Sequence, residues 1–143
     1  MTKKYIDPNP ESGKIFYRDF HGKGKVVMLN LLKFRKFADY TDLELIKPEK
    51  EISGEEAYRL YMESILPILK KADSRILYFG KSQNFLIGPE SQKWDAILLV
   101  EHQSVSKFME FAQSEDYLKK AGHRKAAIED SRLLPSNETK NWV

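Results

Sequence analysis

Two segments of this sequence are apolar on both of their faces, and this property limits the fold more than any other. Residues 26–34 read VVMLNLLKF and residues 94–102 read WDAILLVEH. Neighbouring residues of a strand point to opposite faces of a sheet. The two alternating apolar sets of the first segment are Val27, Leu29 and Leu31 against Val26, Met28, Leu32 and Phe34. Each strand therefore needs an apolar cover on both of its sides.

The chain between these two strands contains a helix and a further strand. Ser53 and Glu56 form the pattern of a capping box, which predicts that a helix begins there. Pro67 lies inside this helix, and we expect it to kink the helix or to remove one hydrogen bond near its end. Residues 75–81 form the next predicted strand, which residues 85–87 either continue or extend as a short hairpin arm.

The C-terminal part of the chain is predicted to be helical and to end in a strand. Ser104 and Ser114 each cap a helix. Gly122 is expected to break the second helix, which resumes over residues 123–130, and residues 132–135 form a short last strand. The order β-α-β-β-α-β predicts an α+β protein of ferredoxin-like fold, with an antiparallel sheet and its helices on one face.

The length of the chain fits one domain with flanking segments. The chain has 143 residues, within the usual size of a single domain. Residues 1–24 contain several Pro and Gly residues and an apolar cluster, and we expect them to form an arm packed on the domain. Residues 25–135 form the ferredoxin-like domain, in which residues 36–52 are a long loop, and residues 136–143 form a polar tail.

The composition excludes several classes of site and predicts a cytoplasmic protein. The chain has no cysteine, which rules out disulfides, zinc–thiolate and iron–sulfur sites and a cysteine nucleophile. Its net charge of +3 is too small to indicate nucleic acid as a partner. The basic N-terminus is not followed by an apolar stretch, and no apolar run approaches the ~20 residues that span a bilayer.

The apolar second face of the sheet predicts a homodimer. The two helices of the pattern cover one face only, so the other face requires a second cover. An identical chain placed face to face supplies that cover, and two-fold dimers are the commonest assemblies of this kind. The alternative is that the N-terminal arm and the loop at 36–52 cover this face within one chain.

Five sequence motifs in order resemble the bacterial family of proteins with domain of unknown function 1330. The matching segments are VVMLNLLKFR at 26–35, SGEEAY at 53–58 with Tyr61 and Pro67, LIGPE at 86–90, WD at 94–95 and HRKAAIEDSRLLP at 123–135. This family is similar in fold to the dimeric α+β barrels, which include small cofactor-free monooxygenases, muconolactone-type isomerases and haem-handling enzymes. The resemblance therefore implies the ferredoxin-like fold and a dimeric α+β barrel, but it supplies no reaction.

Three uncharged polar residues are candidates for a site inside this fold. Asn30 interrupts the first strand on the face of Met28 and Leu32. It either points into a ligand cavity or is a structural amide bonded to its neighbours, because a buried amide without partners costs roughly 1–3 kcal/mol. Tyr61 lies on the core-facing stripe of the first helix and Tyr58 on its flank. Their phenols either contact a substrate carbonyl or are core aromatics.

The remaining candidates carry a charge or an indole ring. His123 could move a proton, Arg124 or Arg35 could hold an anionic group, and Trp94 could form a cavity wall or a dimer anchor. The alternative for the C-terminal candidates is a salt-bridge set of Arg124, Glu129, Asp130 and Arg132. Arg35 is alternatively part of a solvated basic edge with its neighbouring lysines.

No motif of this sequence names a metal or cofactor. The three histidines are far apart in sequence and have no metal-ligand spacing, and no phosphate-binding loop is present. We therefore expect a homodimer that binds a small organic anion without a cofactor. As an enzyme it would be a metal-free isomerase, lyase or cofactor-independent monooxygenase. The alternatives are a non-catalytic ligand-binding or stress-associated dimer and a haem binder with His123 as axial ligand.

Overall fold

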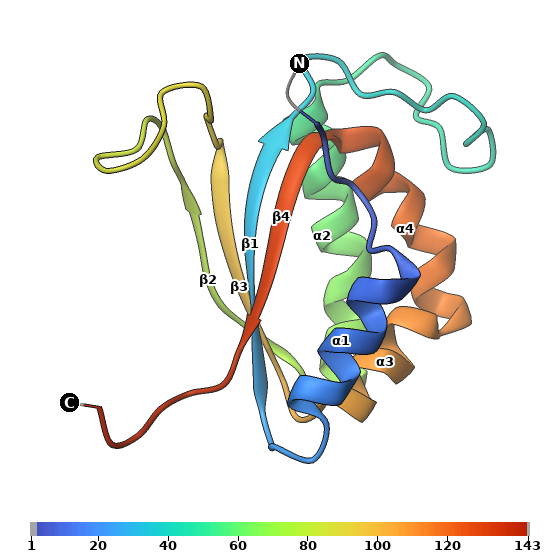
Figure 1. Cartoon of the computed structure of the whole chain (residues 1–143). Helices are drawn as coiled ribbons and strands as arrows, with labels where there is room; N and C mark the ends of the chain where they lie inside the picture. The colour runs from blue at the N-terminus through green and yellow to red at the C-terminus, as the bar shows by residue number, and fades with distance from the viewer. Residues whose placement is uncertain (1–2, 143) are drawn as a thin grey trace.

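A four-stranded antiparallel sheet forms one layer of the protein (Figure 1). The computed structural model describes residues 3–142. β1 (Val26–Phe34) and β3 (Ala96–His102) are the central strands, and β2 (Arg75–Lys81) and β4 (Ile128–Ser136) are the edges, in the order β2-β3-β1-β4. The predicted α+β, ferredoxin-like fold is thereby confirmed.

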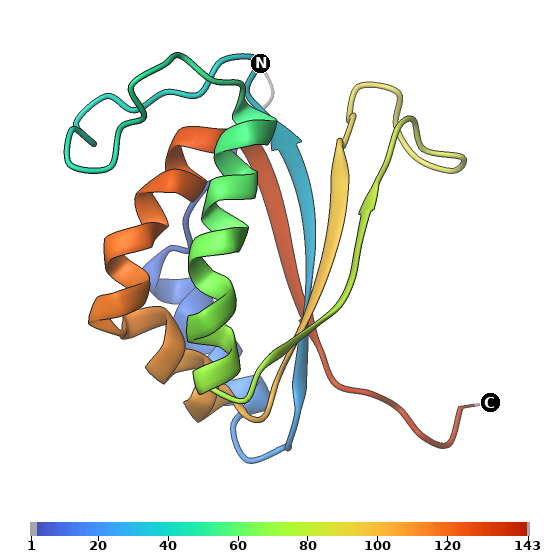
Figure 2. The ribbon, with the colours of Figure 1, turned by 180° about the vertical axis from the view of Figure 1, so that it is seen from behind.

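The helices cover one face of this sheet (Figures 1 and 2). They are α1 (Pro10–Phe20), α2 (Gly54–Lys71), α3 (Val105–Gln113) and α4 (Glu115–Ala127). Among the described residues, none of these helices is both long and apolar enough to cross a bilayer.

The start of α2 shows how local sequence sets this architecture. The backbone N–H of Glu56 donates to Ser53 Oγ at 3.0 Å, and the N–H of Ser53 donates to Glu56 Oε1 at 3.1 Å, as the capping box predicts. Pro67 lies inside the helix without ending it, and α2 continues to Lys71.

Two expectations about the C-terminal part are wrong. Gly122 does not break α4, and residues 128–130 belong to β4 and not to a helix. A Cβ at position 122 would lie 2.6 Å from Ile46 Cδ1, so the long loop packs against the helix where the side chain is missing. Ile128 is completely buried and pairs with Phe34, which makes strand geometry the better arrangement here.

Two further segment boundaries differ from the expectations. Residues 85–87 form no strand, and β3 begins at Ala96 and not at residue 94. The N–H of Asp95 donates to Leu32 O at 2.7 Å, while the Asp95 carboxylate accepts the N–H of Phe34, also at 2.7 Å. The side chain of Asp95 thus replaces a backbone partner at this end of the sheet.

The core lies between the sheet and the helices. Alternate residues of β1 and β3 are buried on the helix-covered face, as the period of two requires. The buried apolar residues contributed by the two strands are Val26, Met28, Leu32, Ala96, Leu98 and Val100. Leu32, Ala96, Leu98 and Val100 belong to one core cluster with the buried α2 residues Ala57, Tyr58, Tyr61, Ile65 and Leu69.

The opposite face of the sheet is apolar and has no cover among the described residues (Figures 1 and 2). Leu29 pairs with Leu99 and Leu31 with Ile97 across the central strands, and these four side chains are only partly buried. Leu134 extends this surface onto β4 and is exposed. We call this surface the open face.

The N-terminal segment and the long loop lie away from the open face. α1 packs on the helix layer, where the ring of Phe16 stands 5.7 Å from that of Phe108 in α3. Before α1, the N–H of Tyr5 donates to Asp130 Oδ1 at 2.8 Å and the hydroxyl of Ser131 donates to Tyr5 O at 2.6 Å. The segment therefore follows β4, and the alternative of a self-covered open face is wrong (Figure 1).

Burial of His102 predicts a pH-dependent stability. His102 is buried, its Nδ1 lies 2.8 Å from Ser74 Oγ, and burial lowers its pKa from 6.5 to about 4. The unfolded chain binds this proton more tightly, so the stabilisation is complete above pH 6.5 and is lost as the pH falls toward 4. We expect the free energy of unfolding to fall by about 2 kcal/mol between pH 7.5 and pH 5 from this group.

Urea unfolding of two single variants at both pH values checks this expectation. His102→Gln removes the titrating group and keeps a neutral hydrogen-bonding side chain, so it should flatten the pH dependence. A smaller dependence remains, because burial also lowers the pKa of His123. His21→Gln changes an exposed histidine and should leave the dependence as in the wild type. An equal pH dependence in wild type and His102→Gln would contradict the assignment.

Candidate functional site

A pair of phenols joins α2 to α4 in the core. Tyr61 and Tyr117 lie with their hydroxyl oxygens 2.8 Å apart, and the ring of Tyr58 is 5.2 Å from that of Tyr61. Both tyrosines of α2 are buried, which places Tyr58 as well as the expected Tyr61 toward the core. We call Tyr58, Tyr61 and Tyr117 the tyrosine cluster.

The tyrosine cluster has hydrogen-bond donors to spare. A hydroxyl donates one proton and accepts at two lone pairs. In the Tyr61–Tyr117 pair one hydroxyl proton fills the mutual bond, and the other remains available to a third group. Among residues 3–142, no hydrogen bond involves the hydroxyl of Tyr58. The cluster can therefore donate to an acceptor that residues 3–142 do not supply.

Arg124 is the basic residue whose charge acts on the phenols of Tyr58 and Tyr61. It is half-buried on α4, its Nη1 donates to Ile6 O at 2.9 Å, and its Nη2 lies 3.5 Å from Ser131 Oγ. None of the ion pairs of the described residues includes Arg124, because Asp130 pairs with Arg132 and Glu129 with Lys4 and Lys33. Of the predicted salt-bridge set only the Asp130–Arg132 pair forms, and Glu129 pairs with lysines outside the set.

The electrostatic surroundings keep the phenols protonated. Burial raises the pKa of Tyr58 and the pKa of Tyr61 well above the usual value of 10.0, and Tyr117 adds to the increase. The charge of Arg124 lowers both pKa values but does not reverse the shift. At physiological pH the Tyr58 and Tyr61 hydroxyls are therefore neutral hydrogen-bond donors.

Asn30 lies on the helix-covered face of the sheet, as expected, and is buried. Its Nδ2 donates to Met28 O and to Leu98 O, at 3.3 Å each. Within residues 3–142, its Oδ1 accepts no hydrogen bond. The backbone thus satisfies the amide protons, which is the structural alternative, while the amide oxygen is left for another donor.

His123 belongs to a different part of the molecule. Its Nδ1 lies 2.8 Å from the hydroxyl of Tyr40 in the long loop, and both side chains are buried. Burial, and next the charge of Lys120, lower the pKa of His123. Burial also raises the pKa of Tyr40, so both partners are neutral near pH 7.

Trp94 lies beside Arg132, at the sheet end opposite the tail. The Arg132 guanidinium stands 4.9 Å from the centre of the Trp94 ring and 4.8 Å from that of Tyr5, between the two aromatic faces. Trp94 is buried, and its Nε1 has no hydrogen-bond partner among the described residues. This indole packs within its own chain and does not contact the tyrosine cluster in any described ring pair.

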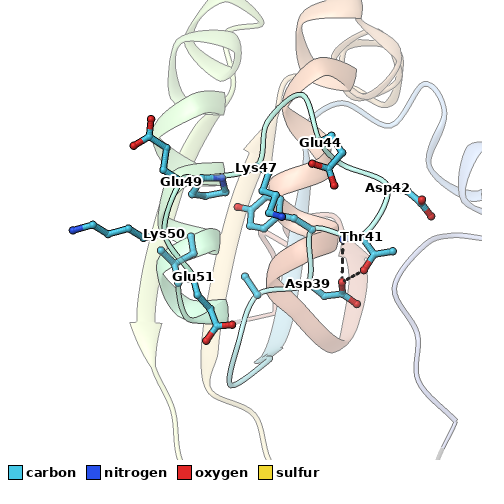
Figure 3. A pocket seen from close by; sticks show the side chains of 12 residues that line it. Asp39, Thr41, Asp42, Glu44, Lys47, Glu49, Lys50 and Glu51 are labelled. Atoms are coloured by element: carbon cyan, nitrogen blue, oxygen red, sulfur yellow. Dashed lines mark hydrogen bonds between the residues drawn. The ribbon is translucent and has the colours of Figure 1, made fainter.

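Arg35 lines the smaller of two cavities that the structure shows around the long loop. This cavity has a volume of about 270 Å³, and its lining also includes Asp39 and Lys125. The larger cavity has a volume of about 590 Å³ and is lined by residues 38–42, 44 and 47–52 (Figure 3). Asp39 Oδ1 accepts from the hydroxyl of Thr41 at 2.6 Å, as the dashed lines show.

Neither of these two cavities brings the predicted site residues together. Arg35 lines the smaller cavity, and Tyr40, which bonds to His123, lines the larger one. Neither wall contains Asn30, Tyr61 or Arg124. Acidic side chains outnumber lysines around the larger cavity, and Lys50 and Asp42 point to opposite sides of it (Figure 3). Among the described residues, no three His, Asp or Glu side chains gather to hold a metal ion.

Sequence reasoning missed two residues of these arrangements, Tyr40 and Tyr117. For Tyr117 a signal was present, because positions 117 and 124 are two helical turns apart and share one face of α4. For Tyr40 there was none, because a residue in a loop without periodicity gives no indication of where its side chain points.

Comparison with solved structures finds full-length relatives. The RPA0582 protein of unknown function from Rhodopseudomonas palustris is 32% identical, with 96% of this chain and 99% of that chain covered and a TM-score of 0.84. Its methylated form is 31% identical, with coverage of 99% and 100% and a TM-score of 0.86. A dimeric protein of unknown function and ferredoxin-like fold from Bacteroides fragilis is 14% identical, with coverage of 83% and 99% and a TM-score of 0.49.

Comparison with families gives a consistent result. No curated protein matches the chain. The family model described as domain of unknown function DUF1330 matches residues 46–135, which include α2, the sheet strands β2 to β4 and the helices between them. With a match over more than half of its length and a relative of 32% identity, the chain belongs to the DUF1330 family.

Proposed function

We propose that this protein is a homodimer that binds a small organic anion at Arg124 and the tyrosine cluster. The observation that carries the proposal is the half-buried guanidinium of Arg124, which is in none of the ion pairs of residues 3–142. A partly buried charge is stabilised by an opposite charge or by hydrogen bonds to it. A carboxylate or an enolate of a ligand would provide both.

The neighbouring groups support a ligand that accepts hydrogen bonds. The free proton of the Tyr61–Tyr117 pair and the hydroxyl of Tyr58 are both donors. Arginine offers five N–H donors in a planar arrangement that matches a carboxylate. A site composed of donors favours a carbonyl, carboxylate or enolate oxygen over an amine or a cation.

Neutral phenols also limit the chemistry of the site. A protonated tyrosine can donate to a carbonyl oxygen and stabilise negative charge that develops there. It cannot act as a base until its pKa is reached, and burial raises the pKa of both Tyr58 and Tyr61. The site is therefore suited to bind and polarise a carbonyl, carboxylate or enolate oxygen, and His123, bonded to Tyr40, takes no part in the proposed binding set.

The open face supports the homodimer. Leu29, Leu31, Ile97 and Leu99 form an apolar patch at the centre of the sheet, without a cover from the described part of the chain. Contiguous exposed apolar surface of this kind marks an interaction site. A second copy related by two-fold symmetry presents the same patch, so the two faces are complementary in chemistry.

Light scattering during size-exclusion chromatography tests the homodimer. We expect twice the chain mass of 16.7 kDa for the wild type at micromolar concentration. Leu99→Glu places a charge in the open face and should give the mass of one chain. The matched control Leu45→Glu changes a fully exposed leucine of the long loop and should stay dimeric. A wild type with the mass of one chain would contradict the homodimer.

Isothermal titration with benzoate and benzamide as probes tests the anion site. We expect benzoate to bind and uncharged benzamide to bind at least tenfold more weakly, because hydrogen bonds to charged groups contribute roughly 1.5–3 kcal/mol. Arg124→Gln should weaken benzoate binding by about 10- to 100-fold. Arg124→Lys, which keeps the charge, should show a smaller loss.

The control for the anion site is Arg18→Gln, which removes an exposed arginine of α1. Its benzoate affinity should equal that of the wild type. Thermal unfolding of each variant shows whether the contact of Arg124 with Ile6 is needed for folding. The anion site is contradicted when folded Arg124→Gln binds benzoate as tightly as the wild type.

A further inference from the structure

The segment between β2 and β3 carries an unusually exposed apolar tip. Leu86 is 99% exposed and Ile87 is 91% exposed, and Phe85 before them is also exposed. Single exposed apolar side chains are common on soluble proteins. Two consecutive aliphatic residues with almost no contact to their own chain are not, and they indicate a surface that is buried in an assembly.

Hydrogen bonds and packing hold this tip in a defined conformation. The N–H of Ser82 donates to Asp95 O at 2.8 Å and closes the base of the segment, and the N–H of Gln92 donates to Pro89 O at 3.2 Å. A Cβ at Gly88 would lie 2.6 Å from the ring of Phe85, so this ring packs directly on the glycine backbone. Phe85 thus folds back along the segment while the next two side chains point outward.

A second projecting segment stands at the other end of the sheet. The chain leaves β4 at Ser136, and Asn137 Nδ2 donates to Lys25 O at 2.8 Å, which fixes the base of the tail. Trp142 in this tail is 85% exposed. Figures 1 and 2 show that the tip segment and the tail both project on the side of the sheet opposite the helices.

We infer that the tip at 85–87 and Trp142 are buried against a second copy of this chain that packs on the open face. We call these two contacts the clasp. The inference rests on the proposed homodimer. A molecule on the open face lies between the two projections and can contact both of them (Figure 1). Two-fold symmetry places two tips and two tails around one interface, so each copy is held at both ends of its sheet.

The chemistry of the projections matches that of the face between them. The tip contributes one aromatic and two aliphatic side chains, and the tail contributes an indole. The face contributes aliphatic side chains from β1, β3 and β4. Aromatic anchors surrounded by apolar surface are typical of the energetically dominant part of an interface.

Sedimentation equilibrium of a double variant tests the clasp. Leu86→Asp with Ile87→Asp places two charges at the tip, away from the core and from the open face. We expect the dissociation constant of the dimer to rise at least tenfold, with the thermal unfolding of the separated chain unchanged. The matched control Leu45→Asp places a charge on an equally exposed leucine of the long loop at 36–52. It should keep the dissociation constant of the wild-type dimer.

Tryptophan fluorescence gives a second readout from the tail. The chain has two tryptophans, and Trp94 is buried within its own chain. A change of emission on dilution therefore reports Trp142. We expect a shift to longer wavelength as dimers dissociate, and no shift in Trp142→Phe.

The outcomes separate the clasp from the homodimer. A wild type that dimerises while the tip variant and its control share one dissociation constant, with Trp142 emission independent of concentration, overturns the clasp and leaves the homodimer intact. A wild type that sediments as a single chain at every concentration overturns both.

Discussion

The structure depends on a sheet that is apolar on both faces and that its own helices cover on one face only. Burial of apolar surface stabilises the helix-covered side, where alternate residues of β1 and β3 pack against α2 and α4. The same alternation leaves Leu29 and Leu99 on the other side. The fold of one chain and its uncovered second face thus have one cause, the apolar residues on both faces of the two central strands.

The core also contains polar groups, and these differ in the hydrogen bonds that they form. Ser74 and His102 form one hydrogen bond, as do Tyr40 and His123. Each of these bonds ties two neighbouring segments of the chain together. The phenols near Arg124 differ, since their donors outnumber the acceptors around them. An excess of donors beside a partly buried cation is what separates this region from the structural pairs.

The order of elements was predictable from the sequence because strand alternation and helix caps are local signals. The capping box at Ser53 and the strand at 26–34 are examples. The misjudged glycine at 122 shows the limit, since its reason is a contact with Ile46, remote in sequence. The grouping of Tyr58, Tyr61 and Arg124 was partly foreseeable. The separation of His123 from them was not, because it depends on Tyr40 in an irregular loop.

Helix α4 contacts both the tyrosine cluster and the long loop. One stripe of this helix carries Tyr117 and Arg124, and another carries Gly122 and His123, which hold the long loop. An α-helix moves as a rigid body, because its backbone bonds fix each residue relative to the next turn. A displacement of α4 as a whole would therefore move Tyr117, beside the other phenols, together with His123, which bonds to Tyr40 of the long loop.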